Sequence, residues 1–122
     1  MCGIGGAINY KHREITVETI GQVADSIRHR GPDDHGFYFA TTGRQTLTRD
    51  LSEGFGFNVS LLHRRLSILD LTERGWQPMQ TPDKRYTITY NVRDDQNVRY
   101  KRSGTLNQYI IVLYVEFRLF SL

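Results

Sequence analysis

The stretch Cys2-Gly3-Ile4-Gly5-Gly6-Ala7-Ile8-Asn9-Tyr10 is a short apolar run broken by glycines. An apolar run of this length predicts a β-strand. Glycines inside a strand leave room for a ligand or another backbone to approach closely. We therefore expect the first strand of a sheet here, with a site beside it.

After this strand the apolar spacing becomes that of a helix. Five apolar residues are predicted to share one face: Val17, Ile20, Val23, Ala24 and Ile27. Thr16 can cap the start of the helix. Gly31-Pro32 ends it, because proline lacks an N–H donor and disfavours helix in the residue before it. One amphipathic helix is expected to pack on the sheet.

Short strands are predicted in most of the remaining chain: at residues 36–40, around the alternating Phe57, Val59 and Leu61, and around Tyr86, Ile88 and Tyr90 after a turn at Pro82-Asp83. The polar residues 41–53 predict a loop. Residues 109–122 form a β-prone apolar segment, which is either a last strand or an aggregation hazard. Since strands outnumber helices, the fold class expected is α+β.

Length, charge and composition exclude several classes of protein. The 122 residues suffice for one modest domain, and no apolar run approaches the roughly 20 residues of a membrane-spanning helix. No secretory signal is recognised, so a cytoplasmic protein with no membrane partner is expected. The net charge of +3 is not gathered into a basic block, so no nucleic-acid partner is expected.

Cys2 is the sole cysteine, which excludes an internal disulfide and an all-cysteine metal site. A lone cysteine is ordinarily a small buried hydrophobe. At position 2, however, removal of Met1 would place a free α-amino group, with an ordinary pKa of about 7.7–8.0, on the same residue as the thiol. That amine can act as the base for its own nucleophile. Attack on a carboxamide would give a thioester and release ammonia.

Five motifs then follow in order: Met1-Cys2-Gly3-Ile4, Arg28-His29-Arg30-Gly31-Pro32-Asp33-Asp34, Leu62-His63-Arg64-Arg65-Leu66-Ser67-Ile68-Leu69-Asp70-Leu71, Gly75-Trp76-Gln77-Pro78-Met79 and Tyr90-Asn91. Together they resemble the class II glutamine amidotransferase domain of asparagine synthetases over residues 1–91. The resemblance implies the N-terminal-nucleophile fold, a four-layer α/β/β/α sandwich, present here only in part.

The resemblance also implies roles for particular residues. Cys2 matches the catalytic nucleophile, and Asn91 matches the asparagine that stabilises the oxyanion and contacts substrate. Arg65 matches the arginine that grips the α-carboxylate of glutamine, to which a planar guanidinium is suited. The pocket-lining segment matches Leu66, Ser67, Ile68 and Leu69.

These side chains also have other interpretations. Arg65 could be a surface residue paired with Asp70 or Glu73. A Cys-His dyad or metal site with His29 or His63 is not favoured, because zinc-ligand spacing is absent and the α-amino group supplies a base. Packing is expected of Trp76 and Met79, and a loop-holding role of Arg30 and Asp33.

The resemblance breaks after Asn91. The family has glycine and glutamate where this chain has Val92 and Arg93, and a downstream aspartate that binds the α-amino group of glutamine has no counterpart. Residues 92–122 therefore form a divergent tail after a partial domain of residues 1–91. A shifted reading frame would explain this, and predicts that another frame encodes Gly-Glu-Ile-Tyr-Asn just after the Asn91 codon.

The function implied is hydrolysis of glutamine to glutamate and ammonia, for amide transfer to aspartate or a related acceptor. The synthetase domain that would need ATP and Mg is missing, so no cofactor is expected in this chain. The alternatives are an inactive truncated remnant, or a small binding or regulatory protein that associates with a full-length relative through unpaired strands.

Overall fold

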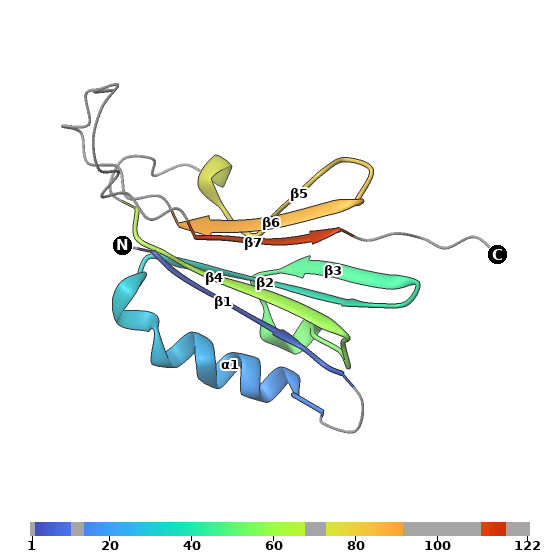
Figure 1. Cartoon of the computed structure of the whole chain (residues 1–122). Coiled ribbons are helices and arrows are strands. Elements are labelled where there is room, and N and C mark those ends of the chain that lie inside the picture. Colours follow the sequence, from blue (N-terminus) through green and yellow to red (C-terminus); the bar gives the residue numbers. More distant parts are fainter. Residues whose placement is uncertain (1, 11–13, 68–72, 92–110, 117–122) are drawn as a thin grey trace, which may run out of the picture.

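A computed structural model describes residues 2–10, 14–67, 73–91 and 111–116 of the chain. The elements along the chain are β1 (Gly3–Ile8), α1 (Val17–Ser26), η1 (Arg28–Arg30), β2 (Asp34–Thr41), β3 (Arg44–Thr48), η2 (Leu51–Glu53), β4 (Val59–Arg65), η3 (Glu73–Gly75), β5 (Met79–Gln80), β6 (Tyr86–Asn91) and β7 (Ile111–Glu116). They form three layers, with α1 on one face of a first sheet and a second sheet on the other (Figure 1). The expected α+β class is confirmed.

The first sheet has the strand order β1-β4-β2-β3 and is antiparallel throughout. Its α1-facing core consists of buried side chains from both layers: Ile20, Ala24, Phe37, Phe39, Phe57 and Leu62. Thr16 caps α1 as predicted, accepting a hydrogen bond from the N–H of Thr19 at 3.2 Å. Val23 was wrongly assigned to the packed face and is 40% exposed. At about 100° per residue, Val23 points roughly 80° from the midline between Ile20 and Ala24, which places it at the edge of the packed face.

Two boundaries in the first sheet differ from the prediction. The predicted loop of residues 41–53 contains β3, which follows β2 through a tight turn at Gly43 with a φ of +79°. The strand predicted around residues 57–61 instead runs from Val59 to Arg65. β4 lies between β1 and β2 and is covered on both faces. Its charged residues at the end of the strand are therefore buried.

The second sheet has the order β5-β6-β7. The strand and turn predicted near residues 82–90 are confirmed, since the N–H of Lys84 bonds to the carbonyl of Thr81 at 2.8 Å. The buried face of β6 is not the apolar one, however. Thr87, Thr89 and Asn91 are buried between the sheets, while Tyr86, Ile88 and Tyr90 are half-buried on the other face. Two glutamine side chains form hydrogen bonds with the threonines of this face. Gln80 Nε2 donates to Thr87 Oγ1 at 3.1 Å, and Thr89 Oγ1 donates to Gln77 Oε1 at 3.3 Å.

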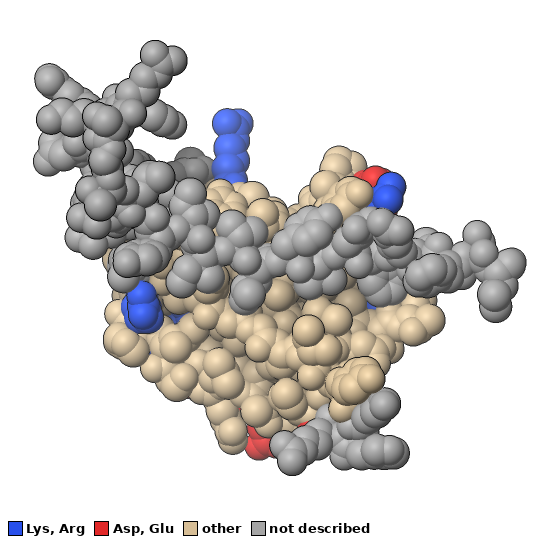
Figure 2. Space-filling model, viewed as in Figure 1, with Lys and Arg blue, Asp and Glu red and all other residues tan. Residues whose placement is uncertain are grey.

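The segment of residues 109–122 contributes β7, which pairs with β6 from Tyr86↔Glu116 to Asn91↔Ile111. The face seen in Figure 2 is largely uncharged over the described elements, and the described Lys and Arg side chains visible there lie apart from one another. Within the part of the chain that the structure describes, no helix is long and apolar enough to cross a membrane.

Candidate active site

Three strand ends meet at one end of the molecule. β1 begins there, and β4 and β6 end there, beside the N-terminus at the left of Figure 1. The antiparallel register pairs Gly3 with Arg64, so Cys2 reaches the segment that follows β4. β6 in turn contacts both β1 and β4. Residues far apart in the sequence therefore converge at this end.

Cys2 lies directly against Leu66. The N–H of Leu66 donates to Cys2 Sγ at 3.4 Å, and the thiol lies 3.9 Å from the carbonyl oxygen of the same residue. Cys2 is a free, half-buried cysteine. The sulfur is thus held at a fixed place without being sealed from solvent.

Arg65 is buried, with 7% of its surface exposed, so the interpretation as a surface arginine is wrong. Alternation along β4 places it on the same face as Leu61 and His63, between the two sheets. Gly75 packs against its guanidinium, because a Cβ added there would lie 2.5 Å from Nη2. This contact was not predicted from the sequence, although Gly75 belongs to the motif Gly75-Trp76-Gln77-Pro78-Met79.

Asp33 fixes the segment that carries Arg65 and Leu66. Its N–H donates to the carbonyl of Arg65 at 3.0 Å, and its Oδ2 accepts from the N–H of Ser67 at 2.7 Å. The predicted loop-holding role of Asp33 is confirmed. The backbone N–H of Arg30 donates to the carbonyl of Ile27 at 3.0 Å, and the predicted role of its side chain stays a prediction.

Asn91 is the last residue of β6 and is buried. Its neighbour Tyr90 is fixed on both sides, since its N–H donates to Gln77 Oε1 at 2.7 Å and its backbone is bonded by the ring of His63. Burial lowers the pKa of His63 to about 4, although the bond to Tyr90 acts to raise it. His63 is therefore neutral at pH 7 and links β4 to β6. Ile68 and Leu69 lie outside the described residues.

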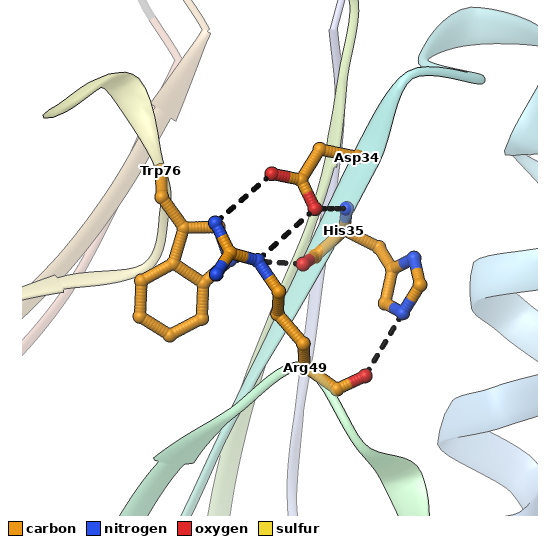
Figure 3. A network of polar contacts seen from close by, with 4 residues as sticks. All are labelled: Asp34, His35, Arg49 and Trp76. Atoms are coloured by element: carbon orange, nitrogen blue, oxygen red, sulfur yellow. Dashed lines mark hydrogen bonds and ion pairs between the residues drawn. The ribbon is translucent and has the colours of Figure 1, made fainter. Parts of the chain in front are cut away.

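A second polar network surrounds the start of β2 (Figure 3). The Asp34 carboxylate accepts from Nε and Nη2 of Arg49, both at 3.2 Å, and from the N–H of His35 at 2.8 Å. Burial alone would raise the pKa of the Asp34 carboxyl, but these bonds outweigh it and hold that pKa below its ordinary value. Trp76 joins the network by donating to the carbonyl of His35 at 2.9 Å, which confirms its structural role.

The described residues contain no group of three or more His, Cys, Asp or Glu side chains that could hold a metal ion. The chemistry available at the convergent strand ends is that of a thiol, a buried guanidinium and a carboxamide.

These observations agree with the comparisons with known proteins. A family model described as a glutamine amidotransferase domain matches residues 1–93, and the chain belongs to this family. The chain is 33% identical to the putative glutamine-hydrolyzing asparagine synthetase 2 of Methanocaldococcus jannaschii, over 93% of this chain and 18% of that protein. It is 37% identical to the glutamine-hydrolyzing asparagine synthetase 1 of Bacillus subtilis, over 75% of this chain and 12% of the relative.

The glutamine-hydrolyzing asparagine synthetase 2 of Bacillus subtilis is 35% identical, over 75% of this chain and 10% of the relative. The chain therefore spans less than a fifth of the length of each of these relatives, and it matches their N-terminal portions. No solved structure gave a significant match.

Proposed function

We propose that the chain hydrolyses glutamine to glutamate and ammonia at Cys2. The observation that carries this proposal is the contact of Cys2 Sγ with the N–H of Leu66 at 3.4 Å. Leu66 directly follows the buried Arg65 in the chain. A cation that binds the α-carboxylate and a nucleophile that attacks the side-chain amide must lie within one glutamine length of each other. Cys2 contacts Leu66, and Leu66 directly follows Arg65, so the thiol and the guanidinium come from neighbouring positions at the end of β4.

The reaction begins once Met1 has been removed. The Cys2 α-amine takes the thiol proton, the sulfur attacks the carboxamide carbon, and the C–N bond breaks as the amine returns the proton to the leaving ammonia. Water then cleaves the thioester to give glutamate. The Asn91 carboxamide donates to the oxyanion, and removal of one such donor costs about 100- to 1000-fold in rate.

Arg65 binds the substrate carboxylate through two parallel N–H bonds, and its burial strengthens them. By the family resemblance the pocket-lining segment comprises Leu66, Ser67, Ile68 and Leu69, of which the structure describes Leu66 and Ser67. In this proposal the described helix and two sheets are three layers of the four-layer N-terminal-nucleophile sandwich. Residues 1–91 then form the glutaminase domain, and residues 92–122 the divergent tail.

The ammonia would serve an asparagine synthase-type reaction with aspartate or a related acceptor. Such a reaction requires ATP and Mg on a synthetase domain, which would act as a partner of this chain in the cytoplasm. The names of the relatives support this assignment, since each is called a glutamine-hydrolyzing asparagine synthetase.

The test is release of ammonia and glutamate from glutamine by the purified chain, with Cys2→Ala as control. Mass spectrometry first establishes that Met1 has been removed. Adding hydroxylamine should divert the thioester to a hydroxamate, which reports the covalent intermediate separately from its hydrolysis. Equal release by the Cys2→Ala chain, or none from soluble Met1-processed protein, would refute the proposal.

A second candidate function, a non-catalytic binding or regulatory protein, is favoured by the edge of the first sheet. β1 is the end strand in the described order, and Ile8 and Tyr10 beside that edge are 70% and 73% exposed. An unpaired strand edge can add a strand from another chain. Co-purification with a full-length relative by a chain that releases no ammonia would support this second function.

A further inference from the structure

A cavity of about 480 Å³ lies between α1 and the first sheet. It is lined by Arg64, on the opposite face of β4 from Arg65, and so is separate from the site at Cys2. Asp25, Arg49 and Asp50 also line it and are exposed, so the cavity opens to solvent at that rim. Its volume falls within the range of roughly 300–1,000 Å³ usual for small-molecule sites.

Arg64 is the unusual residue of this cavity. Only 6% of its surface is exposed, yet its Nε has no hydrogen-bond partner among the described residues. A buried guanidinium is unfavourable unless an acceptor satisfies it. Arg64 lines the cavity, so an anionic ligand there would offset the charge of its guanidinium.

The other arginine of the cavity is already paired. Arg49 bonds to the Asp34 carboxylate and stacks over Trp76, with Cζ 4.8 Å from the ring centroid (Figure 3). The ring of His35 is bonded to the Arg49 carbonyl at 2.9 Å. The charge of Arg49 is thus largely neutralised and its position fixed, which leaves Arg64 as the group that would select a ligand.

The rest of the lining limits what that ligand can be. The carboxylates of Asp25 and Asp50 stand at the rim, and Asp25 lies in the last turn of α1, where the helix dipole also favours a cation. These groups would repel a polyanion such as phosphate and attract an ammonium group. The apolar side chains of Ala24, Phe37 and Leu51 also line the cavity.

We infer that this cavity binds a free α-amino acid with an apolar side chain. The ligand carboxylate is held by Arg64, its ammonium group lies near Asp25 and Asp50, and its side chain packs on Phe37 and Leu51. The site is on the far side of the sheet from Cys2, so its occupation does not depend on glutamine hydrolysis.

The inference is tested by titrating the isotope-labelled full chain with leucine and following its backbone amide signals by NMR. Saturable shifts should gather at residues 21–25 and 49–51. Three probes dissect the ligand: 4-methylpentanoate lacks the ammonium group, 3-methylbutylamine lacks the carboxylate, and inorganic phosphate lacks both the ammonium and the apolar part. Each should bind at least about tenfold more weakly than leucine, the factor expected for loss of one charged contact.

Substitutions complete the test. Arg64→Met should weaken leucine binding at least about tenfold, and the exposed Arg28→Met should leave it unchanged. The double variant Asp25→Asn with Asp50→Ser removes both rim carboxylates, and serine can still cap η2. It should weaken leucine but not 4-methylpentanoate, which keeps the test decisive if Arg64→Met does not fold. Shifts elsewhere, equal binding of phosphate, or unchanged affinity in the double variant would each overturn the inference.

Discussion

The N–H of Leu66 donates to the sulfur of Cys2 across 3.4 Å, and this contact joins the start of β1 to the residue after β4. Arg65 immediately precedes Leu66, so one short segment carries both the donor that holds the sulfur and the buried guanidinium. Its position therefore governs the distance between the proposed nucleophile and the proposed carboxylate-binding group.

Asp33→Ala should loosen that segment. The Asp33 carboxylate accepts from the N–H of Ser67 at 2.7 Å, and a hydrogen bond to a charged group contributes about 1.5–3 kcal/mol. Hydrogen exchange at the Ser67 amide should accelerate by about tenfold or more. Asp83→Ala is the matched control, since Asp83 is an exposed aspartate that accepts from the N–H of Arg85 in a distant turn. An unchanged Ser67 exchange rate in Asp33→Ala would contradict this prediction.

Gly75→Ala should weaken glutamine binding if Arg65 has its proposed role. The added methyl group would lie 2.5 Å from the Arg65 guanidinium, which must then move. A misplaced carboxylate-binding group should raise KM for glutamine by about tenfold with a smaller effect on kcat, because the reacting atoms are untouched. Gly56→Ala, where a methyl group meets nothing within 4 Å, is the control. Equal KM values in the two variants would argue against Arg65 as the carboxylate-binding group.

Gly36→Ala should destabilise the fold by about 2 kcal/mol or more. A Cβ at this position would collide with the backbone carbonyl of Gln77, and Trp76 Nε1 would lie within 2.8 Å of it. The sheet and the Trp76–Gln77 segment would have to separate. Urea unfolding compares this variant with Gly56→Ala, which should change stability by less than about 1 kcal/mol. A Gly36→Ala midpoint equal to that of Gly56→Ala would show that the segment moves without cost.

The start of the helix was predictable, because Thr16 is a strong cap, and the 3.6-residue spacing gave most of the packed face. The predicted end at Gly31-Pro32 was wrong, since α1 ends at Ser26 and Gly31 instead follows the separate 3-10 turn η1. The strands were less predictable. Alternation identifies a strand with one buried face, whereas β4 is covered on both, so the charges of His63, Arg64 and Arg65 obscured its second half.

The site was predictable only through the motifs. Nothing in the local pattern shows that Cys2 would meet Leu66, because that contact depends on the antiparallel register of β1 and β4. The same holds for β6, whose apolar alternation pointed to the wrong buried face. Gln77 and Gln80 reach the strand from the chain before it and satisfy the threonine hydroxyls, a tertiary effect that outweighs the local pattern.

His63 should make the stability of the protein depend on pH. Burial lowers its pKa to about 4, from an ordinary value of 6.5. As the pH falls from about 6.5 to about 4, the unfolded chain gains a proton on this histidine while the folded chain does not. The free energy of unfolding should therefore decrease through this window, by about 3 kcal/mol in total, and His63 should add no further slope below it.

Urea unfolding at a series of pH values between 4 and 7.5 measures this effect. Only the slope is compared, because His63→Gln also removes the ring that links β4 to Tyr90 and will be less stable at every pH. The part of the slope due to His63 should disappear in His63→Gln and persist in His29→Gln, which changes an exposed histidine. If His63→Gln retains the full slope, His63 is protonated in the folded chain as readily as in the unfolded one, and the neutral link between the two sheets is wrong.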